Sequence, residues 1–425
     1  MNFKLSRYII PSVISMVLVG TYTNIDGLFI GNVTGDAGLA AINFVWPIVA
    51  FITSLGTGIG IGGSVLLNNF RGSGNNARAE EIKTSIILML AVLGLLTGLV
   101  FKFTYAPLLR LMGAAEDAVV FEYAKAYADV ISIGAVFQVV GSGLVALLRN
   151  ENKTWFSMIC CIVGLMLHLV LDALLVEKYT LSGVAISTVA SQAVIMILAF
   201  FAIAKGKPAR PRLSDTLPIM KASIAPLGIN FVPSLVLLFT NFFAMKVGGT
   251  PAVTAYTVMS YAVYTFDYAF QGVCDGVQPV ISFCQGSGDA RGEARALKSS
   301  AKILLIMSLG FIALTPLLIL VLPSVFGAGA EAEKIMFWGF IIYAASYPFK
   351  AAVKYFGSYF YAKGKTLSSN LLIFSDPLVL TPILLVALPL LFDINGIWLS
   401  LTIAQAILTV PGAILFIKER KSAKF

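Results

Sequence analysis

Long apolar segments, separated by short polar or Gly- and Pro-containing clusters, follow one another along the whole chain. Most of them reach or exceed the roughly 20 residues that a helix needs to cross a bilayer, and none has the short alternating pattern of an outer-membrane barrel. The pattern predicts an all-α integral membrane protein. Its twelve predicted transmembrane helices have approximate limits 8–31, 39–70, 83–109, 122–148, 155–176, 181–204, 217–247, 253–284, 297–322, 335–362, 367–391 and 394–417.

Composition agrees with this pattern, because 58% of the 425 residues are hydrophobic and only 12% are charged. Soluble domains usually have about 25% charged residues. The net charge of +9 does not indicate a nucleic-acid partner, because 22 of the 30 Lys and Arg residues fall in the polar segments of one predicted side and 5 on the other. The positive-inside rule then predicts a multi-pass protein of the plasma (inner) membrane with both termini in the cytoplasm.

The chain also repeats itself. At an offset of 214 residues Gly35 meets Gly249 and Gly143 meets Gly357, and near the end of the repeat the offset becomes 213. Six predicted helices in each copy give two lobes related by a pseudo-twofold axis along the membrane normal, which is an architecture of transporters. The predicted domains are an N-terminal lobe (1–204), a cytoplasmic linker (205–215) and a C-terminal lobe (216–425).

Nothing in the sequence indicates an enzyme or a resident cofactor. The four cysteines lie in apolar segments without metal-ligand spacing, and no nucleotide-binding loop or catalytic triad is recognisable. Gly58–Gly63 matches G-x-G-x-x-G, but it lies inside an apolar span, where small residues serve close helix packing. An intramembrane transferase would need an acid-rich metal motif, and a non-transporting scaffold would leave the buried acids unexplained.

Ionisable residues inside the apolar segments are the candidates for function. His168, the only histidine, and Asp172 are four residues apart, so they share one face of a helix. Asp26 is the other deeply apolar-flanked carboxylate of the first half. An ionisable group at membrane depth is costly and by default marks an ion or substrate pathway. These three residues therefore predict an ion or substrate pathway in the N-terminal lobe.

The second half carries a different set of charges, for which two interpretations stay open. They either pair with one another and stabilise the lobe, or they form a charged wall of a substrate cavity. Two buried lysines on one helix face would suit an anionic or zwitterionic substrate better than a simple cation. The predicted cavity residues of this half are Asp267, Asp275, Gln278, Lys350, Lys354 and Asp376.

The chain resembles the bacterial multidrug and toxic compound extrusion (MATE) family. The resemblance rests on Asp26-Gly-Leu-Phe-Ile-Gly31, on Gly183–Gln192, and above all on Gly276-Val-Gln278-Pro279-Val-Ile-Ser-Phe. It implies a secondary antiporter that exports amphipathic, often cationic compounds in exchange for protons or sodium. It also implies an N-lobe cation site at Tyr22, Asp26, His168, Asp172 and Thr188.

His168 departs from the family pattern, which usually has asparagine at this position. Imidazole is a poor sodium ligand but titrates near neutral pH, so we expect H⁺ as the coupling ion, with Na⁺ at Asp26 and Asp172 as the alternative. His168 either titrates directly or orients Asp172. The expected partners are an amphipathic small molecule and membrane lipid, and the expected state is a monomer. The rival functions are a lipid-linked precursor flippase and an exporter of anionic or zwitterionic metabolites.

Overall fold

The computed structural model describes residues 4–204, 209–326 and 328–422, apart from the side chains of a few residues that include Tyr22. Helices account for nearly all of it. They are α1 (Ser6–Gly72), α2 (Asn76–Leu111), α3 (Ala118–Asn150), α4 (Thr154–Ile203), α5 (Thr216–Ser287), α6 (Ala290–Val325), α7 (Ala330–Ala344), α8 (Tyr347–Ala362), α9 (Thr366–Ser375), α10 (Thr381–Ala387) and α11 (Pro389–Ser422). Short 3₁₀ turns at Ala114–Glu116 and Leu213–Asp215 and a π-helix at Asp376–Leu380 complete the set in the described ranges.

Nine stretches within the described ranges are helical, long and apolar enough to cross a membrane. Their outward faces are strongly apolar: Leu95, Leu99 and Phe103 on α2, for example, are more than half exposed. Apolar side chains exposed over whole helices would be unfavourable in water, whereas a lipid environment accommodates them. The structure is therefore that of a multi-pass helical membrane protein.

Four of the long helices contain a point at which the backbone reverses. Gly35 in α1 has φ/ψ of 61°/−151° and Gly249 in α5 has 62°/−158°. Thr180 in α4 has 50°/−130° and Asp393 in α11 has 47°/−134°. A single residue with positive φ thus separates two helical arms in each case. The two members of each pair are 214 and 213 residues apart, which are the offsets of the sequence repeat.

The helix caps follow the same offset. Asn75 accepts a hydrogen bond from the backbone N–H of Arg78 at the start of α2 (3.1 Å), and Asp289 accepts one from Gly292 at the start of α6 (2.8 Å). Such side-chain acceptors satisfy N–H groups that have no partner within the helix. The hydrogen bond from Gly292 also lowers the pKa of the Asp289 carboxyl.

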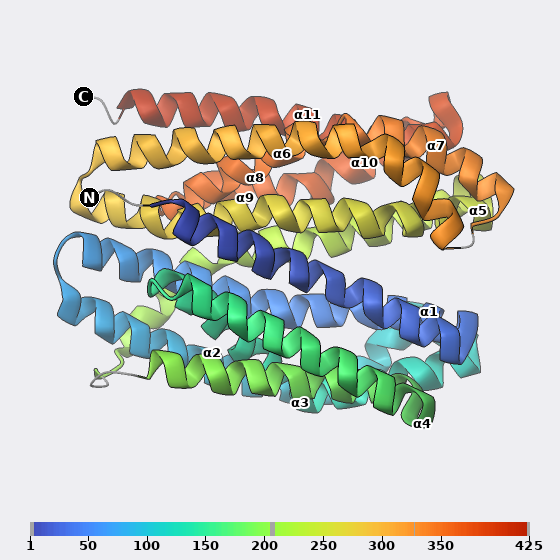
Figure 1. Ribbon diagram of the computed structural model, residues 1–425, viewed down its shortest axis with the longest axis horizontal. Helices are drawn as coiled ribbons and strands as arrows, with labels where there is room; N and C mark the ends of the chain where they lie inside the picture. Colours follow the sequence, from blue (N-terminus) through green and yellow to red (C-terminus); the bar gives the residue numbers. More distant parts are fainter. Residues whose placement is uncertain (1–3, 205–208, 327, 423–425) are drawn as a thin grey trace.

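The helices form two groups that lie side by side (Figure 1). Helices α1–α4, in blue and green, pack together, and α5–α11, in yellow to red, form the second group, with both chain termini at the same end of the molecule. The largest contact between the groups is that of α1 with α5. One core cluster crosses it, combining Ile61, Val65 and Ala146 of the first half with Val277 and Ile281 of the second.

Glycines allow the two halves to approach closely in this interface. Gly276 of α5 lies against the backbone of α1, where a Cβ atom would come within 2.7 Å of the Ile9 Cα. Gly62 of α1 is similarly close to the backbone at Ala222 and Ser223 of α5. Small residues at such positions permit extensive van der Waals contact between membrane helices. The sequence match of Gly58–Gly63 to a nucleotide motif is therefore explained by helix packing.

A buried ion pair also joins the halves. Arg149 near the end of α3 donates to Asp275 of α5 at 3.0 Å, and their side chains are 4% and 1% exposed. Asp275 accepts further hydrogen bonds from Gln271 (2.8 Å) and Tyr361 (3.5 Å). This carboxylate is therefore well provided with donors, and one of them comes from the other half of the molecule.

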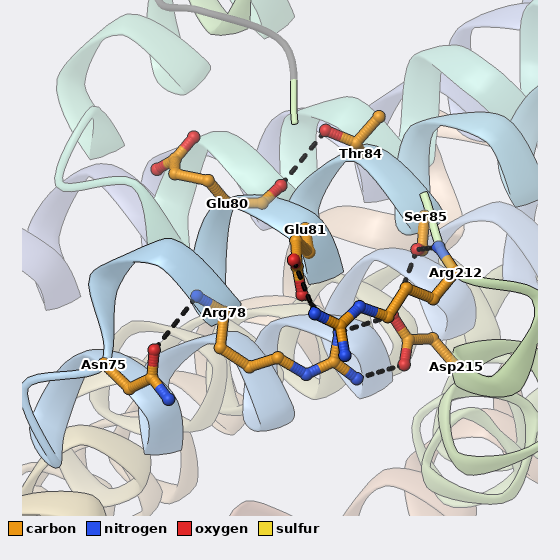
Figure 2. Close-up of polar contacts among 8 residues, drawn as sticks. All are labelled: Asn75, Arg78, Glu80, Glu81, Thr84, Ser85, Arg212 and Asp215. Atoms are coloured by element: carbon orange, nitrogen blue, oxygen red, sulfur yellow. Dashed lines mark hydrogen bonds and ion pairs between the residues drawn. The ribbon is translucent and has the colours of Figure 1, made fainter. Parts of the chain in front are cut away.

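The segment that leads into α5 is held on α2 by a polar network (Figure 2). Asp215 accepts hydrogen bonds from both terminal nitrogens of the Arg78 guanidinium group and from the Ser85 hydroxyl (3.2 Å). Arg212 bonds to Glu81 at 2.7 Å, and its backbone N–H donates to Ser85. Residues 212–215 are therefore fixed to the first half, directly before the second half begins.

Two predicted helices are interrupted. The predicted segment 335–362 consists of α7 and α8, which meet at Ala345 and Ser346, just before Pro348. The predicted segment 367–391 contains the π-helix Asp376–Leu380, which includes Pro377 and is followed by Pro382 in α10. Because proline has no backbone N–H, the regular hydrogen-bond ladder cannot continue through these positions.

Candidate functional site

Three ionisable side chains meet inside the first half. Nε2 of His168 lies 2.6 Å from Oδ1 of Asp26 and 3.1 Å from Oδ2 of Asp172. His168 and Asp172 come from successive turns of the first arm of α4, and Asp26 comes from the first arm of α1. The helical spacing of His168 and Asp172 is as predicted from the sequence. Through the additional contact with Asp26, the imidazole links α1 and α4.

Asp26 is the member of this triad that faces open space. It lines a cavity of about 1190 Å³, walled mainly by the first half and completed by Asn230 and Tyr268 of α5, which we call the central cavity. His168 and Asp172 are fully buried and do not line it. The triad is thus layered, with one carboxylate at the cavity wall, the imidazole behind it, and the second carboxylate in contact with the imidazole.

Asp26 also faces a second space, of about 1060 Å³, which we call the cleft. The cleft is bounded by the first arm of α1 and the start of its second arm on one side, and by α5 on the other, so it lies between the two halves. Trp46, Asn230 and Tyr268 line both spaces. A solute in the cleft would therefore be next to the same carboxylate as a solute in the central cavity.

The other residues predicted for this site are placed as follows. Thr188 lines the central cavity, and its hydroxyl donates to the Val184 carbonyl at 3.0 Å. The side chain of Tyr22 lies outside the described residues. The cavity is also lined by four polar residues of α3 that the sequence reasoning did not place there: Tyr127, Gln138, Ser142 and Arg149. The signal that could have found the first three is the occurrence of these polar groups within the apolar segment 122–148.

Gln138 is notable because its amide is buried and makes no hydrogen bond to another residue in the described part of the protein. A buried amide without partners is costly, so a hydrogen-bonding ligand or water in the central cavity would stabilise it. Gln138, Asp26 and Arg149 thus give this largely apolar space a neutral polar group, a carboxylate and a guanidinium group. Such a combination is typical of a site for small amphipathic molecules.

The charged residues of the second half gather around a smaller space of about 680 Å³, which we call the α8 pocket. Lys354 pairs with Asp267 at 3.0 Å, whereas Lys350 is 4.0 Å from the same carboxylate. Asp376 accepts hydrogen bonds from Thr381 and Gln405, both at 2.6 Å. Mutual pairing is therefore confirmed for Lys354 and Asp267, and these charges also line a pocket; its use as a substrate cavity stays a prediction.

Two residues predicted for this cavity lie elsewhere. Asp275 is engaged by Arg149 in the contact between the halves and lines none of the spaces described above. Gln278 is also buried away from them, and its amide donates to the Ser282 hydroxyl at 3.1 Å. The physical reason is their position along α5. Both residues come after the part of the helix that lines the pockets, where α5 packs against neighbouring helices.

A helical membrane protein with two groups of helices, a cleft between them and a buried carboxylate at its wall has the form of a secondary transporter. Comparisons with known proteins make this specific. Residues 11–174 match the MatE family model. The multidrug export protein MepA of Staphylococcus saprophyticus is 22% identical over 96% of this chain and 92% of its own length. The chain is thus similar to MATE proteins, in its first 174 residues to the family model and over most of its length, at low identity, to the MepA proteins.

Solved structures share the fold over nearly the whole chain. An outward-facing multidrug resistance MATE transporter of the MOP superfamily matches with a TM-score of 0.88 at 19% identity, over 99% of this chain and 96% of that one. A MATE protein in complex with MaL6 matches with a TM-score of 0.89 at 20% identity and the same coverage. A MOP superfamily transporter from Pyrococcus furiosus, described as having a binding pocket of reverse polarity, also reaches 0.89, at 19% identity over 99% and 96% of the two chains.

Proposed function

We propose that the protein is a secondary antiporter that exports amphipathic organic compounds in exchange for protons by alternating access. The observation that carries this proposal is the triad of Asp26, His168 and Asp172, with Asp26 in the wall of both the central cavity and the cleft. The names of the distant MepA relatives support multidrug export as the activity.

The architecture that we propose has twelve transmembrane helices in two six-helix lobes. The reversals at Thr180 and Gly249 each divide a long helix into two arms that could each cross the membrane, and α7 and α8 together supply one further crossing in addition to the nine apolar stretches. The matching dihedral angles support lobes at 1–204 and 216–425, joined by 205–215. The distribution of Lys and Arg supports cytoplasmic termini in the plasma membrane.

The chemistry of exchange follows from the position of Asp26. A cationic solute and a proton would compete for the same carboxylate at the cavity wall. A proton arriving at Asp26 could be shared with Asp172 through the imidazole nitrogen, which contacts both carboxylates. The proton would reduce the negative charge at the wall and so favour release of a cationic solute. Loss of the proton toward the cytoplasm would restore the binding site.

Sodium is the alternative coupling ion. One oxygen of each carboxylate and a ring nitrogen of His168 lie within 4.8 Å of one another, a spacing that could hold a cation. However, sodium prefers oxygen ligands, and the group between the two carboxylates is an imidazole nitrogen. His168 as the bridging group therefore supports protons over sodium.

The test is substrate-driven proton movement in proteoliposomes that contain the pure protein and a pH dye. We expect lipophilic cations to evoke proton flux without sodium in the wild type. The flux should be lost in Asp26→Asn and Asp172→Asn. Retention of coupling in His168→Asn would limit the histidine to a positioning role. Transport that requires sodium would refute proton coupling, and movement of a labelled lipid in place of solutes would favour a flippase.

A further inference from the structure

The α8 pocket contains a positively charged group with unused hydrogen-bonding capacity. The Lys350 ammonium makes no hydrogen bond to any residue within the ranges that the structure describes. The ammonium nitrogen lies 4.0 Å from the Asp267 carboxylate and 5.1 Å from the centroid of the Tyr343 ring, over its face. An ammonium group carries three donors, and its side chain here is only 15% exposed.

The carboxylates of the pocket are already supplied by other donors. Asp267 forms an ion pair with Lys354 at 3.0 Å, and the Lys354 ammonium also donates a hydrogen bond to the Gln271 side-chain oxygen at 3.3 Å. Both oxygens of Asp376 accept short hydrogen bonds, one from Thr381 and one from Gln405. The arrangement therefore leaves Lys350 as the cation of the cluster that lacks a close acceptor.

The surroundings of Lys350 suit the anionic end of a partly apolar molecule. Ile229, Val232, Leu372 and Leu401 line the same pocket and offer an apolar wall beside the ammonium group. Access is also provided, because Pro233 and Tyr264 line both the α8 pocket and the cleft. A solute in the cleft could thus reach the pocket past these two side chains.

We propose that the Lys350 ammonium binds the carboxylate of an amphipathic solute, zwitterions included, with the apolar body of the solute against the wall of the α8 pocket. This proposal rests on the proposed function, because it names one substrate class of the exporter. The site differs in sign from the site at Asp26. The protein would then accept cations through its first half and carboxylates through its second half.

The test uses two dyes that differ in one group. Rhodamine 110 carries a free carboxylate beside its cationic ring system, and rhodamine 123 is its methyl ester. Fluorescence polarisation with the purified full chain gives the affinity for each dye. We expect Lys350→Gln to lower the ratio of rhodamine 110 affinity to rhodamine 123 affinity by about tenfold or more, because a hydrogen bond to a charged group is lost. Lys350→Arg, which keeps a cationic donor, should retain the ratio.

A competition measurement on the wild type makes the proposal testable even if the variants fold poorly. Benzoate should displace rhodamine 110, and methyl benzoate should be much weaker. An unchanged dye ratio in Lys350→Gln, or equal displacement by the two competitors, would overturn the carboxylate site. Substrate-driven proton flux that persists in that case would leave the proposed antiport intact, whereas failure to bind either dye would count against both.

Discussion

Replacing Arg149 with methionine removes one partner of the buried ion pair that joins the two halves. The substitution keeps an unbranched side chain of similar length in the helix but leaves the Asp275 carboxylate without its cation. This pair lies with the glycine contacts in the interface where the halves touch. We therefore expect Arg149→Met to destabilise this closed interface relative to a state in which the halves separate there and water reaches Asp275.

The structure sets the size of the effect. Breaking a buried ion pair by removing one partner costs about 3–5 kcal/mol. Arg149 contacts Oδ2 of Asp275, whereas Gln271 and Tyr361 donate to Oδ1 and remain in place. The lower end of the range, about 3 kcal/mol, is therefore appropriate. It corresponds to a shift of roughly a hundredfold in the ratio of closed to open molecules.

A reporter cysteine in the interface would measure this shift. Val65 is 1% exposed and belongs to the core cluster shared by the halves, so Val65→Cys should react with a methanethiosulfonate reagent only when the interface opens. The background would lack the four native cysteines. We expect Arg149→Met to raise the labelling rate by roughly a hundredfold, in proportion to the open fraction.

Two variants serve as controls. Arg212→Ala removes an arginine whose side chain is 55% exposed in its pair with Glu81, and such pairs contribute only about 0–1 kcal/mol. It should leave the labelling rate nearly unchanged. Arg149→Met combined with Asp275→Asn should recover much of the closed state, because no unpaired charge remains. If Arg149→Met labels no faster than Arg212→Ala, the pair does not hold the interface closed.

Two further predictions concern packing and the segment before α5. Gly276→Ala should lower the midpoint of thermal unfolding, because overpacking against the α1 backbone at Ile9 costs about 1–3 kcal/mol. Gly310→Ala should leave the midpoint unchanged, because no atom lies within 4 Å of the new methyl group. An equal effect of the two substitutions would contradict this packing argument. Asp215→Asn should weaken the hydrogen bonds by which Arg78 and Ser85 hold residues 212–215. Tryptic cleavage after Arg212, followed in a gel time course, should then become faster. An unchanged cleavage rate would show that the network does not hold the segment.

The sequence was sufficient to predict a helical membrane protein and the residues of the first-half triad. The i, i+4 spacing placed His168 and Asp172 on one face because a helix has a fixed period. The contact with Asp26 could not be derived in the same way, since it depends on how α1 and α4 pack. The pairing of Arg149 with Asp275, 126 residues away, is likewise a tertiary contact that the sequence does not reveal.

The second half shows the same limit. Mutual pairing of its charges was one of the two sequence interpretations, and the structure bears it out for Lys354 but leaves Lys350 without a close acceptor. Which of two lysines four residues apart receives the Asp267 carboxylate depends on differences of about one ångström. The π-helix at Asp376 is likewise a local result of Pro377 and Pro382 that hydrophobic periodicity does not reveal.

The reversals at Gly35, Thr180 and Gly249 have a mechanical consequence. Each joins two helical arms through a single residue, so there is no loop at these points that could stretch or fold. Each pair of arms should therefore move as one rigid, V-shaped unit. Any rearrangement of the molecule must then come from these units sliding or rocking against one another. The contact between α1 and α5, where Gly62 and Gly276 carry no side chains that interlock, would resist such a movement least.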